Sequence, residues 1–345
     1  MLVSALSAQV ALAMAQAGAQ GDTQTEIIKA LGYSVSSTEV NEAVMKLAED
    51  LLNRGGEEKI NLANLVVGNS DNFKINSSYE KLIDKYYNFK NAAEAPVVSL
   101  PFSDGQTLID INTWVKANTD DQIKEILSKL NDDMVAILLN ALLFEGKWQH
   151  PFQERSTYNT SKVKPSTDPR WKFAAHEFTS ASGKKVDVDM MSGQEIPFEL
   201  ANAKDFDLLT LAFCAKSHEE TVFGNEKRTV CDKQGNFALD LVVPTGKKSV
   251  YEVAASLNQK TYEAALAKQK PQRNGLHVPK FKFEYGAKEA KKLKPYLKSM
   301  GMKKAFVPIA EAFSPLGVER SGKRIFVEAV SYTHLTLPTI RRGWG

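Results

Sequence analysis

Residues 134–152 of this 345-residue chain read MVAILLNALLFEGKWQHPF. From Met134 to Phe144 the run is almost entirely apolar, and Asn140 is its one strongly polar residue. A membrane-spanning helix needs about 20 apolar residues, so this run is too short to cross a bilayer. A short apolar run that ends at polar residues instead predicts a β-strand buried on both faces.

The amide side chain of Asn140 needs hydrogen-bond partners if this strand is buried. A buried amide must form hydrogen bonds inside the protein, because burial removes those that it makes with water. We therefore expect Asn140 to join two parts of the core. The simplest interpretation is a central strand with one hydrogen-bonded amide, but the block that follows, from Gly146 to Phe152, is more distinctive.

Length and composition are those of an ordinary globular protein. Hydrophobic residues make up 43% of the sequence and charged residues 25%, which allows a sizeable core. The net charge of +3 gives no reason to expect a nucleic-acid partner, and no apolar run is long enough to predict a membrane span. Two cysteines, Cys214 and Cys231, flank one polar segment. A single disulfide across that segment and two free thiols are both consistent with the sequence.

The pattern of elements changes along the chain. Helical spacing dominates the first third, whereas short apolar and alternating runs are mixed with helices after residue 144. We see no internal repeat and no regular alternation of strands and helices. The predicted fold class is therefore α+β.

Local signals predict where several helices begin. Ser36, Ser77 and Ser249 each precede a Glu by three residues, which is the spacing of a capping box. Asp22 is expected to cap a short helix that ends at Leu31, and a further helix is expected to start near Asp104.

Other segments carry periodic patterns. The sequence predicts a weak helix over 123–130, a half-buried strand over 186–190, a polar loop or hairpin over 214–236 and a helix over 287–300.

A search for catalytic motifs gives no candidate. The chain has no G-x-S-x-G, no Walker loop, no dinucleotide fingerprint and no H-E-x-x-H. None of its five histidines has a metal-like spacing to Cys, Asp or Glu; they are His150, His176, His218, His277 and His334. We therefore expect neither an enzyme nor a metal or other cofactor.

One basic cluster stands out. A polyanion such as a sulfated glycan could bind there, although such clusters are commonly the solvated face of a helix. The cluster consists of Lys288, Lys291, Lys292, Lys294, Lys298, Lys303 and Lys304.

Two acceptor patterns for N-glycosylation begin at Asn76 and Asn159. They have meaning only in a secreted protein.

Several blocks occur in the order that they have in one known family. Residues 140–152 (NALLFEGKWQHPF) resemble the serpin pattern N-A-x-x-F-x-G-x-W-x-x-x-F, and residues 4–21 resemble S-P-x-S…A-L-x-M…G-A-x-G. Shorter matches are 111–115 to I-N-x-W-V, 278–281 to L-P-K-F, and 300–314 to L-G-M…A-F…F-S. The chain thus resembles a serpin over residues 1–330.

The resemblance implies a fold of three β-sheets surrounded by helices. The strand at 134–144 would be the third of the large sheet, and the helix after Asp104 would lie across that sheet. Ser4, Ser7 and Asn140 match the shutter, the region where the large sheet opens. Trp148 matches the breach, where insertion of the reactive loop begins.

The resemblance also implies a function. An inhibitory serpin offers a loop to a serine protease, or less often a cysteine protease, and traps the acyl-enzyme when the cleaved loop inserts into the sheet. A non-inhibitory serpin (a chaperone, carrier or storage protein) and a polyanion-binding protein are the alternatives. Most of the family acts outside cells, which favours an extracellular location, and no membrane or nucleic-acid partner is expected.

Two departures from the family pattern affect these expectations. The match begins inside the equivalent of the family's second helix. Residues 331–345 (SYTHLTLPTIRRGWG) match nothing in the family, although its fifth strand, hinge and reactive loop would be expected there. We expect this tail to be an artefact of transcript assembly and the chain as written to be inactive, so neither Arg341 nor Arg342 is assigned to a reactive bond.

Overall fold

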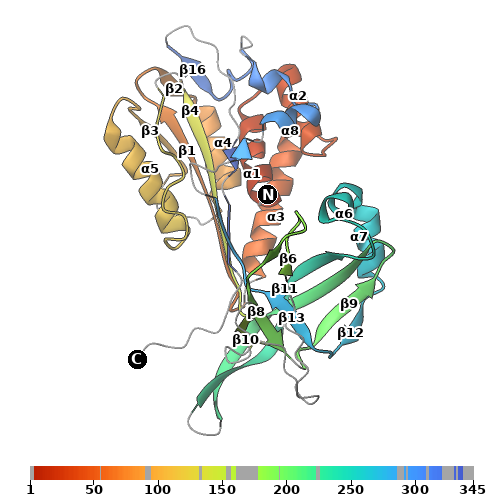
Figure 1. The fold of residues 1–345 in the computed structure, drawn as a ribbon. Helices are drawn as coiled ribbons and strands as arrows, with labels where there is room; N and C mark the ends of the chain where they lie inside the picture. The colour runs from red at the N-terminus through yellow and green to blue at the C-terminus, as the bar shows by residue number, and fades with distance from the viewer. Residues whose placement is uncertain are drawn as a thin grey trace, which may run out of the picture. The chain divides into compact units, whose positions relative to one another are not determined.

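The computed structural model describes residues 4–54, 56–89, 95–131, 134–152, 157–160, 178–193, 195–222, 226–285, 291–292, 294–307, 311–320, 330–331 and 333–336. The chain divides into two compact units. The first unit comprises Met1–Arg54, Ile60–Phe144 and Phe283–Leu335, and the second comprises Gly55–Lys59, Glu145–Lys282 and Thr336–Gly345. Figure 1 labels most of their elements.

Helices dominate the first part of the first unit. In chain order its larger elements are α1 (Ala5–Ala17), α2 (Gly21–Ala30), α3 (Ser37–Asn53), β1 (Lys59–Asn69), β2 (Phe73–Ile75), α4 (Ser77–Tyr87), β3 (Val97–Leu100), α5 (Gly105–Asn118) and β4 (Ala136–Glu145). After residue 282 follow β14 (Lys282–Tyr285), β15 (Lys291–Lys292), α8 (Lys294–Ser299), the 3₁₀-helix Lys304–Phe306, β16 (Gly317–Glu319), β17 (Val330–Ser331) and β18 (Thr333–Thr336).

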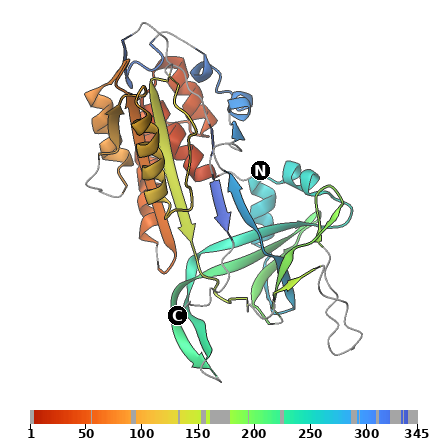
Figure 2. The ribbon, with the colours of Figure 1, turned by 60° about the vertical axis from the view of Figure 1, so that its left-hand side comes forward.

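A sheet with strand order β3-β1-β4 forms the centre of this unit. Strands β1 and β3 are parallel, with Val67 opposite Val98. Successive side chains of a strand point to opposite faces, and each face has its own core. Helix α5 covers one face (Figure 2), where Ile111 and Val115 pack with Leu65 and Leu139. On the other face, Val66 packs in a cluster with residues of α1 and α4.

Local hydrogen bonds explain where several helices begin. Ser36 caps α3 in a complete capping box with Glu39, as predicted. Asp104 caps α5 through the backbone N–H of Gln106. The box at Ser249 is also confirmed, at the start of α6 (Val250–Ser256).

The second unit is built mainly from strands. Two sheets have the orders β11-β10-β9-β12 and β13-β8-β5. Their strands are β5 (Tyr158–Asn159), β8 (Asp189–Gly193), β9 (Phe198–Asn202), β10 (Phe206–Val222), β11 (Glu226–Pro244), β12 (Lys270–Gln272) and β13 (Leu276–Pro279). The remaining elements are β6 (Phe178–Thr179), β7 (Lys185–Val186), α6 and α7 (Gln259–Leu266).

Strands β10 and β11 form a long antiparallel hairpin, whose far part is the segment predicted as a loop or hairpin. Cys214 and Cys231 are joined by a disulfide across it, with their Cα atoms 5.8 Å apart. The pairing register shifts between Ala212 and Ser217. The disulfide therefore ties the two strands together where their regular pairing is disturbed.

Four sequence predictions of helices or helix caps differ from the structure. In each case, residues outside the predicted segment bind its backbone or side-chain groups. Residues 123–130 form no helix, since Asn112 Oδ1 accepts from the N–H groups of Ile126 and Leu127 at 2.8 and 3.2 Å. No capping box forms at Ser77. The N-cap residue is Asn76, whose amide donates to the Ser314 and Pro315 carbonyls.

The other two failures concern Asp22 and the segment 287–300. Asp22 lies inside the first turn of α2 and pairs with Lys304 instead of capping the helix. Among the described residues of 287–300, the helix covers Lys294–Ser299, and Lys291–Lys292 form β15, which pairs with β17. Residues 286–290 and 293 lie outside the described residues.

Two strand predictions hold only in part. The pattern over 186–190 is divided between β7 and β8. In β4, Leu139, Ala141 and Leu143 are buried while their neighbours are half-buried or exposed. Burial on both faces is therefore not reached, because β4 is the last strand of the sheet among the described residues.

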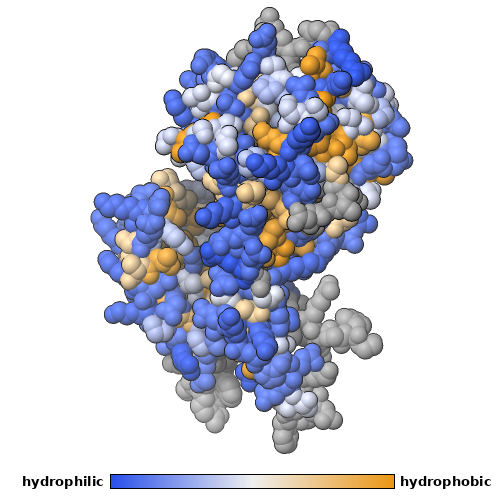
Figure 3. Space-filling model, turned by 180° about the vertical axis from the view of Figure 1, so that it is seen from behind, coloured by the Kyte–Doolittle hydropathy of each residue, from blue (hydrophilic) through white to orange (hydrophobic). Residues whose placement is uncertain are grey.

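Hydrophilic side chains cover much of the surface seen from behind, with hydrophobic patches between them (Figure 3). Within the described ranges, no helix combines the length and the apolar character that a membrane span requires.

The disulfide gives the first testable prediction. Replacing both Cys214 and Cys231 by Ser should lower the free energy of unfolding of the second unit by up to about 3 kcal/mol, because the bridge restricts the unfolded chain. Urea unfolding monitored by circular dichroism measures the change. The reduced wild-type chain is the control, and its urea midpoint should equal that of the variant. Equal midpoints for the oxidised wild type and the variant would contradict the prediction.

Candidate functional site

Asn140 links two neighbouring strands of the first unit, as the sequence predicts for a buried amide. Its Nδ2 donates to Asn64 Oδ1 at 2.8 Å, which joins β4 to β1. Asn64 in turn donates through Nδ2 to the backbone carbonyl of Tyr87 at 2.9 Å, at the end of α4. A relay of side-chain amides therefore crosses from one strand to the next and on to a helix.

The two serines of the predicted shutter lie at the start of α1. Ser4 is the N-cap residue, and its Oγ accepts from the backbone N–H of Ser7 at 3.1 Å. Ser7 Oγ lies 3.5 Å from the backbone carbonyl oxygen of Asn140, which is longer than an ordinary O–H···O hydrogen bond. The structure thus brings Ser7 and Asn140 together, while Ser4 fixes the helix turn that carries Ser7.

A second group of polar side chains lies behind this relay. Asn41 Oδ1 accepts from Tyr87 Oη at 2.6 Å and from Gln16 Nε2 at 2.7 Å. Burial raises the pKa of the Tyr87 hydroxyl, so it remains a donor. Sequence reasoning missed this group. The available signal was a polar residue inside an apolar helix face, such as Gln16 among the small residues of α1.

Two acceptors of this network lack a hydrogen-bond donor among the described residues. They are Asn140 Oδ1 and Gln16 Oε1, both buried. A buried acceptor without a donor costs about 1–3 kcal/mol. A donor that reached Asn140 would therefore be stabilised there.

Trp148, the predicted breach residue, lies in the core of the second unit. Its ring stacks on Phe213 with centroids 4.8 Å apart and meets Phe152 edge-on at 6.3 Å. Trp148 is 4% exposed. Two backbone hydrogen bonds hold the segment against β10, from Cys214 N to the Lys147 carbonyl and from Gln149 N to the Ala212 carbonyl. The conspicuous sequence block is thus a buried aromatic anchor.

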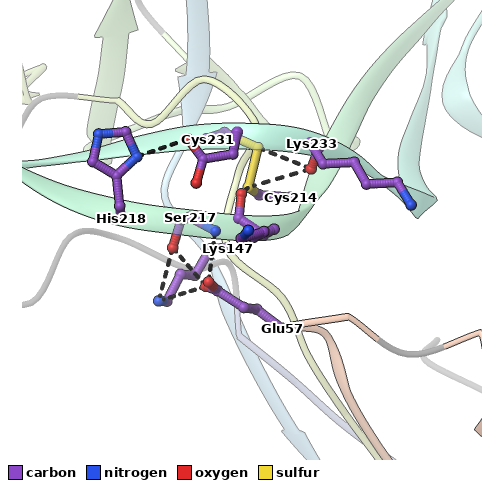
Figure 4. Close-up of a disulfide and its surroundings, with 9 residues drawn as sticks. Glu57, Lys147, Cys214, Ser217, His218, Cys231 and Lys233 are labelled. Carbon is purple, nitrogen blue, oxygen red and sulfur yellow. Dashed lines mark hydrogen bonds and ion pairs between the residues drawn. A yellow bond between two sulfur atoms is a disulfide. The ribbon is translucent and has the colours of Figure 1, made fainter.

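A charged cluster beside the disulfide was not predicted (Figure 4). Glu57 accepts from Ser217 Oγ at 2.6 Å and from Lys147 Nζ at 2.9 Å, and its other oxygen accepts from the Ser217 backbone N–H. These donors lower the pKa of the Glu57 carboxyl to about 2, with Ser217 the largest cause. Contacts between residues so distant in the chain leave no periodic signal in the sequence.

The basic cluster does not form one helical face. Lys291 and Lys292 belong to β15, Lys294 and Lys298 belong to α8, and Lys288 lies outside the described residues. Lys304 is paired with Asp22.

The two glycosylation acceptors are both hydrogen-bonded. Asn76 Nδ2 donates to the Ser314 carbonyl at 2.7 Å. Asn159 Nδ2 donates to Asp189 Oδ1 at 3.0 Å. Both assignments stay predictions.

Metal ligands do not gather anywhere in the part of the chain that the structure describes. No three His, Cys, Asp or Glu side chains within it are placed to hold an ion.

Comparison with known proteins identifies the family pattern independently. A family model described as "Serpin (serine protease inhibitor)" matches residues 1–333. Iripin-3 of Ixodes ricinus is 25% identical over 310 residues, which cover 88% of this chain and 67% of the relative. Alpha-1-antitrypsin 1-5 of Mus musculus is 30% identical over 159 residues, which cover 45% of this chain and only 37% of that protein.

Solved structures show the same fold. The structure of the thermophilic serpin tengpin in its native state superposes with a TM-score of 0.76 at 24% identity, and the match covers 97% of this chain and 74% of tengpin. Thyroxine-binding globulin in complex with thyroxine gives a TM-score of 0.75 at 20% identity, covering 99% of this chain and 81% of that one. The predicted α+β serpin fold is confirmed.

The Asn64–Asn140 pair predicts the result of one substitution. Asn140→Ala should lower the melting temperature and promote polymers on heating, because it removes a hydrogen bond between β4 and β1 and leaves Asn64 without its donor. Thermal unfolding and native gels after heating measure both effects. Asn61→Ala is the matched control, since that amide on β1 donates to the Asn118 carbonyl beyond the sheet. Polymers in equal amount from both variants would argue against a special role for Asn140.

The Glu57 cluster predicts a pH dependence. The carboxyl pKa is lower in the folded chain (about 2) than its ordinary value of 4.5, so ionised Glu57 stabilises the fold above pH 4.5, and this contribution is lost as the pH falls toward 2. Glu57→Gln should therefore be less stable than wild type at neutral pH. The difference in stability between the two proteins should vanish as the pH approaches 2. Urea midpoints between pH 2 and 7 test this, with the exposed Glu220→Gln as control. A difference that does not change with pH would rule out the carboxylate as its source.

Proposed function

We propose, on the premise that this chain belongs to the serpin family, that it represents an inhibitor of serine-type endopeptidases that acts as a suicide substrate. The description of the family model and the relatives that bear the name of inhibitors support this proposal. The chain spans about two thirds of Iripin-3 and a smaller part of the antitrypsins. The activity of the whole protein is therefore part of the proposal.

The observation that carries the proposal is the edge of β4. Among the described residues, β4 has β1 on one side and no strand on the other. An open edge offers unpaired backbone groups to an added strand. Serpin loop insertion is itself a standard example of such strand addition, and the inserted loop would lie beside β4.

Asn140 would take part in this step. Its Nδ2 is bonded to Asn64, whereas its buried Oδ1 has no donor within the described chain. A strand that arrives at β4 could supply that donor. The gain in backbone hydrogen bonds and side-chain burial would make insertion downhill, which is what a trap for the acyl-enzyme requires.

The partner in this proposal is a serine protease, or less often a cysteine protease, met outside the cell. A sulfated glycan bound by the basic cluster is a secondary proposal. Lys298 and Lys303 are exposed members of this cluster.

A second part of the proposal concerns the residues after Val330. Residues 331–345 resemble neither the hinge nor the reactive loop of a serpin, so we propose that they carry no reactive bond. The chain 1–345 should then fail to inhibit, whereas a chain that carries the hinge and reactive loop of a serpin after Val330 should inhibit.

A protease assay tests both parts of this proposal. The chain 1–345 and a continued chain, in which the hinge and reactive loop of a serpin follow Val330, are each incubated with trypsin, chymotrypsin and elastase, and denaturing gels detect covalent complexes. We expect a complex from the continued chain alone. A complex from 1–345 would refute the assignment of the tail. Cleavage of the continued chain without any complex, in spite of a hinge of small residues, would favour a non-inhibitory serpin.

A further inference from the structure

The sheet and helix of the first unit line a cavity that is open to solvent on one side and that the proposed inhibition does not use. Its volume is about 310 Å³, roughly the space of ten water molecules in the liquid. Strand β1 contributes Leu65, β3 contributes Val98 and Leu100, and α5 contributes Asp110, Ile111 and Trp114. A space of this size is at the lower end of those that bind small molecules.

The position of the cavity follows from the register of the strands. Val67 lies opposite Val98 in the parallel pair of β1 and β3. Side chains two residues apart share a face, so Leu65 and Leu100 lie on the face that carries Val67 and Val98. This is the face that α5 covers (Figure 2). The cavity therefore lies between the side of α5 and the outer strand β3.

The helix contributes two residues of different chemistry to the same side. Ile111 and Val115 are buried against the sheet. Asp110 and Trp114 each precede one of them and are separated by one helical turn, so both lie along the flank that faces the cavity. Trp114 is half-buried and Asp110 is exposed at the rim.

The walls and the rim call for a ligand with two parts. The apolar walls cannot satisfy water, which makes an apolar body the better occupant. The indole of Trp114 can stack on an aromatic ring and attract a cation through its π face. Asp110 Oδ1 accepts from Gln106 Nε2 at 2.8 Å, and no basic side chain forms a salt bridge with Asp110 in the described part of the chain. Its charge is thus available at the rim.

We propose that this cavity is a binding site for a small aromatic amine in its cationic form. The ring would enter between β3 and α5 and stack on Trp114, and the ammonium group would remain at the rim beside Asp110. Charge complementarity selects a cation over a neutral or anionic molecule of the same shape. This site is separate from the β4 edge that carries the proposed inhibition, so either proposal can fail without the other.

Three probes of matched shape test the proposal on the whole chain. They are 2-naphthylmethylammonium, neutral 2-naphthylmethanol and anionic 2-naphthoate. Protein labelled with 5-fluorotryptophan is titrated with each probe and followed by fluorine NMR, with the Trp114 resonance assigned from Trp114→Phe. We expect the ammonium probe to shift the Trp114 resonance and to bind about three- to tenfold more tightly than the alcohol, with the naphthoate weakest.

Two substitutions and one control locate the site. Asp110→Asn should reduce the affinity of the ammonium probe to that of the alcohol and leave the alcohol unchanged. Val98→Phe should fill the cavity and abolish binding of all three probes. Asp84→Asn is the matched control, because that exposed helical carboxylate also accepts from an amide four residues away, and it should change nothing.

The outcomes decide the proposal in either direction. Equal affinities for the ammonium probe and the alcohol, or a probe that leaves the Trp114 resonance unmoved, would overturn it. If Val98→Phe fails to fold, the wild-type titration and Asp110→Asn still decide.

Discussion

An amide placed between buried strands must find its hydrogen bonds inside the protein, and the centre of the first unit is arranged around this constraint. Asn140 donates a hydrogen bond to Asn64 on the neighbouring strand, and Asn64 donates one to the Tyr87 carbonyl at the end of α4. Removing one member leaves its partner buried and unpaired, which costs more than the bond itself contributes. The strands and the helix are therefore held in one register by a few polar groups, while apolar packing supplies most of the stability.

Polar contacts and apolar packing lie on different faces of the sheet. One face packs against α1 and α4 and carries the polar relay and the Gln16–Asn41–Tyr87 group. The other face packs against α5 through aliphatic side chains and leaves the cavity beside Trp114. Polar groups specify position because they need a partner at one distance and angle, whereas apolar groups tolerate small shifts. A small-molecule site on the apolar face is compatible with a precise register on the polar one.

The second unit uses two other means of fixing its long hairpin. A disulfide joins Cys214 to Cys231 where the pairing of β10 and β11 is irregular, and Glu57 binds Ser217 and Lys147 beside it. Covalent and charged contacts take over where the ladder of backbone hydrogen bonds is disturbed. The sequence showed two cysteines around a polar segment but not whether they pair, because pairing depends on the distance between two strands.

The sequence by itself determined the features that depend on near neighbours or on a long apolar run. These are the caps at Ser36 and Ser249, the helix that begins near Asp104, the strand around Asn140, the α+β class and the family. Only the tertiary structure decided which partners the polar groups found. Asn112 takes the backbone N–H groups that would have begun a helix at 123–130, and Asn76 binds carbonyls more than 230 residues away. The physical reason is that a cap joins residues three positions apart, whereas these contacts exist only after distant segments have packed.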